Sequence, residues 1–312
     1  MTVWTVGEKH LVVAAAYAAP SVHNTRPWVV EFGAGQRDVC LYERLDRALP
    51  RHDPLGRDRL ISCGAALAHV LVAVRMLGWT TETELFPDPA HPDLVGRVSV
   101  TGRAEPADVD RAAYHSMSAR HSHRKPFAHT PVPAETRALL LAANRTDGVG
   151  LRVVSDVDAE ALAKVLSHSA LVLRADRAYQ RELVAWTSAV RDPVPGDGVS
   201  TATRHTATLP WAGLVRPNTA VPDVGTLANR LRSEFLVLVE TPDDGPVDHV
   251  RAGTAAEQVW LAATAAGLSG SVLTQPFQLP ESRAGLVESL DLNGFPQLML
   301  RFGLSTDHRE ER

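Results

Sequence analysis

The sequence predicts an α+β protein built from two similar halves, each an antiparallel-type sheet flanked by helices. Three observations lead to this prediction. The chain has 312 residues, more than the roughly 250 to 300 at which a single hydrophobic core usually stops growing. Short strand-like segments alternate with apolar helix-like segments along it. An Ala- and Gly-rich helix also occurs twice, at the same place in each half.

The first half begins with an apolar helix and continues with a strand pair. Residues 8 to 18 are mostly Ala, Val and Leu and stop before Pro20, which favours a helix that ends there. Residues 28 to 32 (WVVEF) are typical of a strand, and residues 37 to 45 (RDVCLYERL) of its antiparallel neighbour. A long apolar helix and a further strand are expected at 60–79 and 96–100.

A Pro- and acid-rich stretch at 103–110 predicts a linker, so we expect one half at residues 1–110 and the other at 111–312. Helices are expected in the second half at 112–120, 133–144, 158–189 and 252–267, and strands at 149–155, 234–241 and 297–302. Residues 192–228 are rich in Pro and Gly and too long for a plain connection, which favours a lid.

The repeat lies in two helices with small residues near their starts. CGAALA at 63–68 leads to Gly78, and AGTAAE at 252–257 leads to Gly267; in both, a short strand-like segment follows. Small side chains permit close approach of two backbones. Any buried Ala-rich helix shares this composition, so the pattern alone leaves a chance similarity open.

Composition and missing motifs narrow the function. The net charge of −4 gives no broad basic surface for nucleic acid or anionic lipid, so we expect a small-molecule or protein partner. Two cysteines without a CxxC pattern support neither a disulfide framework nor a thiolate zinc site. The N-terminal residues lack a signal-peptide pattern, and we expect a cytoplasmic protein without a membrane span. Triad hydrolase, Rossmann, P-loop and HExxH motifs are absent from the sequence.

A second short stretch, RHSHR at 120–124, indicates an anion site. In an extended chain Arg120, Ser122 and Arg124 share one face, and two guanidiniums with a hydroxyl suit a phosphate. A solvated basic turn is the plain alternative. The histidines between them form an HxH pair, but acidic or thiol ligands are missing nearby, so we expect no metal.

The stretch AAPSVHNTRPW at 18–28 joins the first helix to the first strand. Ser21 and Asn24 offer side-chain hydrogen bonds after a helix that Pro20 ends. On physical grounds alone an ordinary helix-to-strand turn explains it, and one wall of a ligand site is the other interpretation.

Together, APSVHNTRPW and RHSHR resemble the motifs of the nitroreductase family of FMN-dependent oxidoreductases. The apolar helix that ends in Gly and the closing PQLMLRFG strand are similar to the family's C-terminal portion. In that family an RxSxR-type segment grips the flavin phosphate, and an APSxxNxQPW-type segment packs on the flavin from the partner subunit. Family members are homodimers with an FMN at each of two interface sites.

The placement of the two motifs implies one flavin site per chain. The first half has APSVHN without a preceding RxSxR, and the second half has RHSHR without a following APSxxN. One complete site therefore needs both halves, which implies an intrachain pseudo-dimer with a single FMN, either monomeric or further dimerised. This arrangement resembles the fused Acg-like subgroup of actinobacteria, whose members have been regarded as flavin-holding proteins as much as reductases.

The resemblance also implies roles for individual residues. Arg120 and Ser122 would bind the FMN phosphate, and Arg124 either the phosphate or the flavin N1–C2=O edge. Pro20, Ser21 and Asn24 would line the flavin from the other half, with Arg26 in the position where the family has Gln. The backbone at Leu273 and Thr274 would lie near flavin N5.

The implied activity is an NAD(P)H-dependent reduction of FMN followed by transfer of two electrons to a nitroaromatic or quinone acceptor. The cofactor performs this chemistry, so we expect no catalytic side chain. A catalytically silent protein that stores or sequesters FMN under a lid is the alternative. A regulatory or partner-binding protein on a degenerate enzyme scaffold is a third interpretation.

Overall fold

The computed structural model describes residues 4–33, 37–187 and 215–306. In these ranges the helices are α1 (Val6–Ala18), α2 (Arg57–Met76), α3 (Asp108–Ser116), α4 (Ala134–Ala142), α5 (Ala159–Ala175), α6 (Arg177–Thr187), α7 (Val224–Arg232), α8 (Pro246–Ala265) and α9 (Pro280–Leu290). The strands are β1 (Trp28–Phe32), β2 (Asp38–Glu43), β3 (Trp79–Leu85), β4 (Leu94–Arg103), β5 (Gly150–Val153), β6 (Phe235–Thr241), β7 (Ser269–Leu273) and β8 (Phe295–Gly303).

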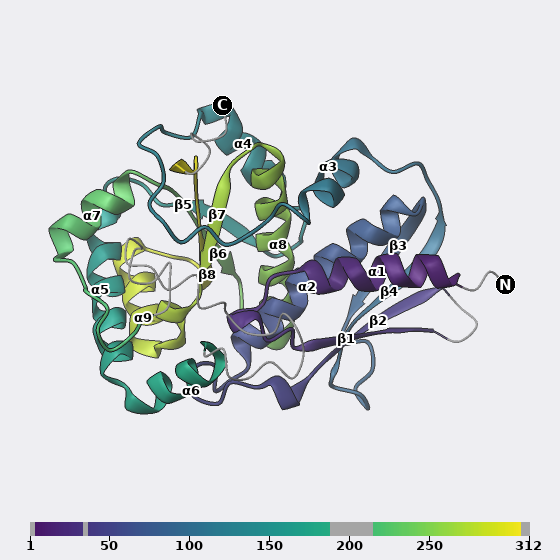
Figure 1. The fold of residues 1–312 in the computed structure, drawn as a ribbon, viewed down its shortest axis with the longest axis horizontal. Helices are drawn as coiled ribbons and strands as arrows, with labels where there is room; N and C mark the ends of the chain where they lie inside the picture. The colour runs from purple at the N-terminus through teal and green to yellow at the C-terminus, as the bar shows by residue number, and fades with distance from the viewer. Residues whose placement is uncertain (1–3, 34–36, 188–214, 307–312) are drawn as a thin grey trace.

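The strands form two antiparallel sheets of the same topology. The first sheet has the order β1-β2-β4-β3 and the second the order β5-β6-β8-β7, so each strand of one sheet has a counterpart in the other. The predicted pairing of β1 with β2 is confirmed, in a register from Trp28 opposite Glu43 to Phe32 opposite Val39. The predicted α+β architecture of two similar halves is therefore confirmed, and Figure 1 shows the two sheets on either side of α2 and α8.

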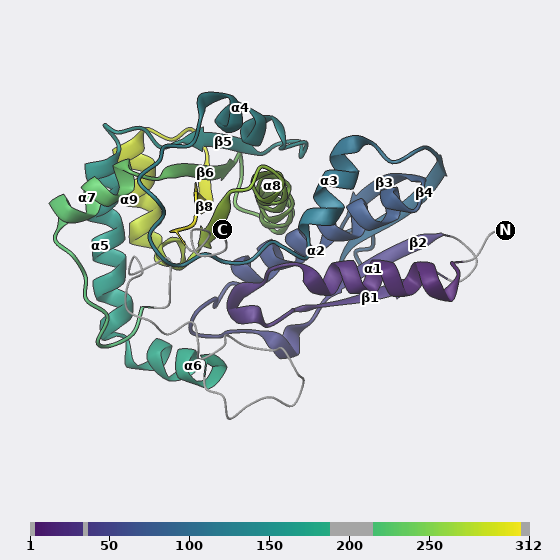
Figure 2. The same cartoon turned by 45° about the horizontal axis from the view of Figure 1, so that its top comes forward.

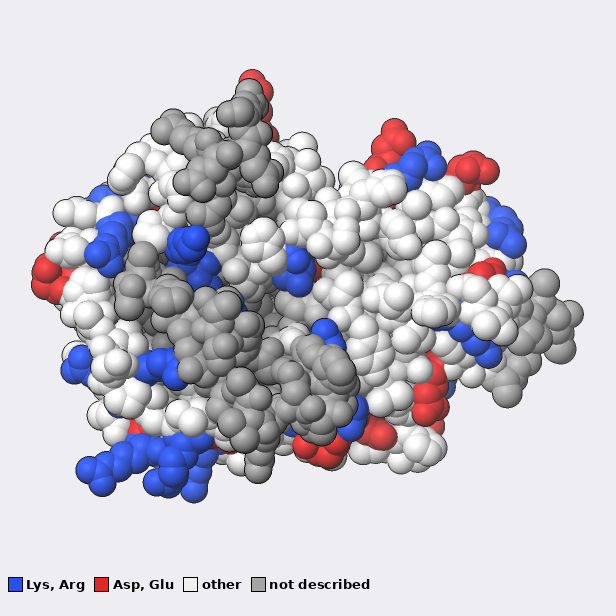
Figure 3. Space-filling model, in the orientation of Figure 1, with Lys and Arg blue, Asp and Glu red and all other residues white. Residues whose placement is uncertain are grey.

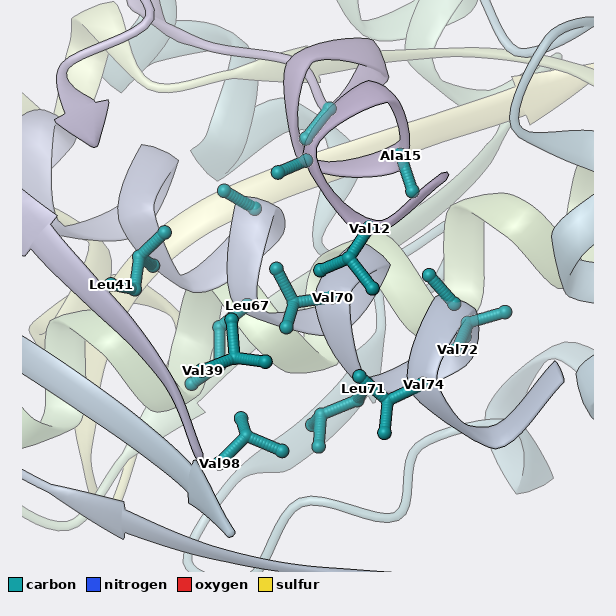
Figure 4. Packing of buried hydrophobic residues seen from close by; sticks show 14 of the residues in the cluster. Val12, Ala15, Val39, Leu41, Leu67, Val70, Leu71, Val72, Val74 and Val98 are labelled. Carbon is teal, nitrogen blue, oxygen red and sulfur yellow. The ribbon is translucent and has the colours of Figure 1, made fainter. Parts of the chain in front are cut away.

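Helices cover the two sheets differently. In the first half, α1 and α2 pack on the sheet, and Val39, Leu41 and Val98 point from its strands into their shared core (Figure 4). In the second half, α8 covers one face while α7 and α9 contact the other, with α5 packed on both of those helices (Figure 2). This double cover explains the continuous apolar runs of β6 and β8, which are buried on both faces.

The two repeated helices, α2 and α8, cross in the centre of the molecule, where glycines let their backbones touch. A methyl group on Gly64 would overlap the carbonyl of Val250, and one on Gly253 would overlap the carbonyl of Ile61. Gly78 and Gly267 then follow the two helices in the left-handed region at φ +78° and +76°, which glycine adopts without a steric penalty. The repeat in the sequence thus corresponds to a structural repeat of helix, glycine and strand.

By length and hydropathy alone α2 could cross a membrane, but 83% of its most apolar 18-residue window is buried inside the protein. It contacts α8, α1 and the first sheet, and is therefore the core helix of the first half.

On the face drawn in Figure 3, basic and acidic side chains of the described residues are interspersed.

Some predicted boundaries were wrong. The helix expected at 60–79 ends at Met76, and Trp79 already begins β3, the edge strand that corresponds to the strand-like segment predicted after Gly78. The helix expected at 112–120 is α3, four residues earlier, because α3 packs on both α2 and α8. A lid was predicted at residues 192–228. Residues 192–214 of this segment lie outside the described residues. Its described part packs into the second half, where Val215 and α7 belong to the core that includes α5.

Candidate functional site

A pocket lies between the halves, beside the crossing of α2 and α8. The first half contributes the loop from Pro20 to His23, the first turns of α2 and His52. The second half contributes Ser122, Arg124 and residues of α8, β7 and β8. The two motifs singled out in the sequence therefore meet at one pocket, although about 100 residues separate them.

The loop of the first motif has an unusual backbone. His23, Asn24 and Arg26 have φ values of +46°, +56° and +46°, a region that side chains other than glycine rarely adopt. Two serines hold this shape: Val22 N–H donates to Ser62 Oγ (3.1 Å), and Arg26 N–H donates to Ser21 Oγ (2.9 Å). Backbone strain of this kind gathers at functional sites, which favours the ligand-site interpretation over an ordinary turn.

Of the four first-half residues predicted to line the flavin, only two line the pocket. These are Pro20 and Ser21. Asn24 and Arg26 lie further along the strained loop, half-buried and outside the pocket lining. His23, between them, is buried at 7% exposure and lines the pocket, although the sequence analysis assigned it no role.

The second motif is extended, as its alternating pattern predicted. Ser122 forms a parallel bridge with Gly270 of β7, and His123 N–H donates to Gly270 O at 2.8 Å. Ser122 and Arg124 both line the pocket. This bridged segment brings a hydroxyl and a guanidinium to one wall of the pocket, while their role as phosphate ligands stays a prediction.

Arg124 is the cation that this wall presents to a ligand. It is half-buried, and burial lowers the pKa of its guanidinium below the ordinary value. Within the described parts of the chain no carboxylate pairs with it. A desolvated cation without a counter-charge favours an anionic ligand, and arginine suits phosphate oxygens.

Arg120 has a different environment from Arg124. Its Nε lies 3.3 Å from Oε1 of Glu257, and its guanidinium lies 4.8 Å from the ring centroid of Trp260. Glu257 is buried at 1% exposure and its Oε1 also lies 2.8 Å from Nε2 of His69. The predicted phosphate ligand is therefore already paired with a buried carboxylate, and Arg120 itself is not a lining residue.

Of the two residues predicted to lie near flavin N5, Leu273 and Thr274, only Thr274 lines the pocket. The side chain of Leu273 is buried in the core of the second half, whereas Thr274 and Gln275 line the pocket. Oε1 of Gln275 is buried and lacks a hydrogen-bond partner among the described residues. It is placed to accept a hydrogen bond from a bound ligand.

The rest of the lining combines apolar side chains with further polar ones, among them His52, Asp58 and Glu257. Trp260, Leu298 and Leu300 supply apolar surface of the kind that a flat aromatic ring requires. His52 and Asp58 come from the segment RHDPLGRD, and their nitrogen and oxygen atoms lie 3.2 Å apart. None of the three residues His52, Asp58 and Glu257 was predicted from the sequence to lie in a site. Glu257 could have been found in the sequence, because it is a single acidic residue within the apolar part of α8.

The comparisons with known proteins identify a family, and its model includes the second motif. The family model described as Nitroreductase family matches residues 117–304. A Mycobacterium tuberculosis (strain ATCC 25618 / H37Rv) protein named "Putative NAD(P)H nitroreductase Rv3131" is 31% identical over 302 residues, which cover 94% of this chain and 83% of the relative. The acg protein of the same strain is 30% identical over 301 residues, with 96% and 89% covered. The chain belongs to the nitroreductase family.

Solved structures of similar fold include two nitroreductases. One is the FMN-dependent nitroreductase NfnB of Mycobacterium smegmatis in complex with NADPH, at 18% identity and a TM-score of 0.40 over 64% of this chain and 90% of that one. The other is a nitroreductase of Bacteroides fragilis with bound FMN, at 16% identity and a TM-score of 0.40 over 64% and 91%. The family assignment depends on the sequence matches alone.

Proposed function

We propose that the protein binds one FMN in the pocket between its halves and uses it as an NAD(P)H-dependent oxidoreductase. The observation that carries this proposal is Arg124, a half-buried guanidinium without a described carboxylate partner, at the edge of an apolar pocket. The names of its relatives, NAD(P)H nitroreductases, and the FMN of solved family members support the same cofactor and reductant.

The residues of the pocket fit FMN chemically. Arg124 and the Ser122 hydroxyl would hold the phosphate, and Trp260 and Leu300 offer apolar surface to the isoalloxazine ring. The loop at Pro20 and Ser21 would cover the ring from the first half, with Asn24 and Arg26 shaping that loop. The backbone at Leu273 and Thr274 would lie near N5.

When bound, FMN would supply hydride transfer between NAD(P)H and a small acceptor, a nitroaromatic or a quinone. The protein binds the phosphate, orients the ring and excludes water from one of its faces. Each half supplies one motif, and we therefore infer an intrachain pseudo-dimer with its boundary near residue 110. We expect it to work in the cytoplasm, without nucleic acid or membrane partners.

The visible spectrum of the purified protein, followed by anaerobic NADH or NADPH, tests this proposal. A flavin band that bleaches promptly with either nucleotide is the expected result. A band that bleaches with dithionite but with neither nucleotide contradicts the reductase and favours the sequestration protein. Purification without flavin, and no uptake of added FMN, contradicts both and favours the regulatory interpretation.

A further inference from the structure

Three buried side chains from the first half form a line of hydrogen bonds that ends at the pocket. His23 Nε2 lies 3.3 Å from His52 Nδ1, and His52 Nε2 lies 3.2 Å from Asp58 Oδ2. Their exposures are 7%, 2% and 1%, and all three line the pocket. Side chains separated by up to 35 positions in the sequence thus connect a carboxylate to the strained loop.

The line is held from both halves. The ring of Tyr179 on α6 stacks on His52 at 5.7 Å, with 25° between the planes. Oε1 of Glu182, also on α6, accepts a hydrogen bond from His52 N–H at 2.7 Å. Arg57 donates to Oδ1 of Asp58 at 2.9 Å, which leaves Oδ2 for His52. His52 and Asp58 therefore each have a partner outside the line, while the His23 ring contacts His52.

The charges around the line decide where a proton can stay. Burial and the positive charges of His52 and Arg124 hold the pKa of His23 well below its ordinary range, although Asp58 acts against them. Burial acts to raise the pKa of Asp58, but Arg57 and His52 outweigh it and hold this pKa well below the usual range. His23 can therefore pass a proton but not store one, while the ionised Asp58 faces Nε2 of His52 at the other end of the line. The other titratable groups facing the line are Asp53, Tyr179 and Glu182.

We propose that Asp58, His52 and His23 form a proton relay that protonates the electron acceptor in this pocket. His23 is the catalytic residue that touches the acceptor, and His52 and Asp58 act through it. This inference rests on the proposed function: FMN, when bound, would supply the hydride to the acceptor, and the relay would supply the proton. It assigns a source for the proton that the cofactor alone does not provide.

The step balances for a quinone. The acceptor gains a hydride, which originates from NAD(P)H, and one of its oxygens takes the proton from Nδ1 of His23. Nε2 of His23 takes the proton from Nδ1 of His52, whose remaining proton stays on Nε2 towards Asp58. One hydride and one proton convert the quinone to the hydroquinone. His52, left neutral, regains a proton from solvent before the next turnover.

The first test follows the protons themselves in protein labelled with ¹⁵N-histidine, with or without FMN. Long-range ¹H–¹⁵N NMR reports which ring nitrogen of His23 is protonated. We expect this proton to move from Nδ1 to Nε2 as pH rises and the line loses one proton. In His52→Gln the movement disappears. A His23 ring that keeps one tautomer at every pH in the wild type overturns the relay.

The second test separates the two half-reactions by stopped flow with a benzoquinone as acceptor. We expect His23→Gln and His52→Gln to slow reoxidation of the reduced flavin about 100-fold, with flavin reduction by NAD(P)H unchanged. Asp58→Asn, which keeps the size of the side chain, is the second variant in case a glutamine prevents folding. His249→Gln is the matched control, since His249 is buried and bonded to Asp244 but lies outside the pocket lining.

The outcomes distinguish the relay from the function on which it rests. Variants that hold full FMN and reoxidise at the wild-type rate overturn the relay and leave the oxidoreductase intact. A wild type that takes up no FMN overturns the proposed oxidoreductase. The proposed relay is then overturned too, because it has no electron acceptor to protonate. A lost tautomer change in His52→Gln together with slow reoxidation supports both.

Discussion

At the scale of single residues, Arg124 and Arg120 have opposite surroundings, and their variants should behave differently. Arg124→Ala should weaken FMN binding on the order of 10- to 100-fold, because it removes a charge-assisted hydrogen-bond donor. Fluorescence titration with FMN measures this loss. Arg124→Lys keeps the charge but loses the two-pronged guanidinium, so its affinity for FMN should lie between those of the wild type and Arg124→Ala. Arg111→Ala, on the exposed side of α3, is the control. Unchanged affinity in Arg124→Ala would contradict its assignment to the phosphate.

Arg120→Ala should reduce stability more than it reduces FMN affinity. It leaves the Glu257 carboxylate buried without its cation, a change that costs about 3 to 5 kcal/mol in other buried ion pairs. Urea unfolding of the flavin-free protein measures the cost, and the double variant Arg120→Met with Glu257→Gln should recover much of it. Severe loss of FMN at full stability would instead support the direct phosphate contact that the sequence predicts.

At the scale of elements, the crossing of α2 and α8 depends on two glycines. Gly64→Ala and Gly253→Ala place a methyl group against a carbonyl of the facing helix, so the helices must move apart. We expect each to reduce the free energy of unfolding by about 1 to 3 kcal/mol. Gly7→Ala, in α1 with open space around it, is the matched control and should stabilise slightly. Equal effects at all three sites would contradict a tight crossing.

The start of α1 should be sensitive to acid. Partial burial acts to raise the pKa of Glu8, but hydrogen bonds from Thr5 and Arg37 outweigh it and lower this pKa to about 2, from an ordinary value of 4.5. Because the folded pKa is depressed, the stabilisation is present above pH 4.5 and is lost as pH falls towards 2. Glu8→Gln should therefore be less stable by about 1 kcal/mol at pH 7 and approach the wild type at pH 3. Urea unfolding at pH 7 and pH 3 measures the difference in the free energy of unfolding between the wild type and Glu8→Gln. The same difference at both pH values would contradict this prediction.

At the scale of the whole molecule, the halves share a central helix pair and should unfold together. FMN in the pocket contacts both halves, so it should raise the midpoint of a single thermal transition, by an amount set by its concentration relative to Kd. Calorimetry with increasing FMN measures this shift. Two separate transitions, of which FMN moves only one, would contradict a site shared between the halves.

The sequence predicted the fold better than the site, for a physical reason. Local patterns define β1, β2, β6 and α4, and the glycine-bearing helices revealed the repeat. The edge strand β3 was predicted only as an unbounded strand-like segment after Gly78, because its Thr and Glu residues give a weak apolar pattern. Ser122 and Arg124 could be found because an extended segment places alternate residues on one side. His23, His52 and Asp58 could not, because only the folded chain brings their ring and carboxylate atoms together.

The measurement that tests the central claim most directly is the number of FMN molecules bound per chain. Absorbance of released flavin against protein concentration, after saturation with FMN and removal of the excess, gives this number. A site that needs one motif from each half predicts one FMN per chain, and its loss in Arg124→Ala. Two FMN per chain, or none, would contradict the account.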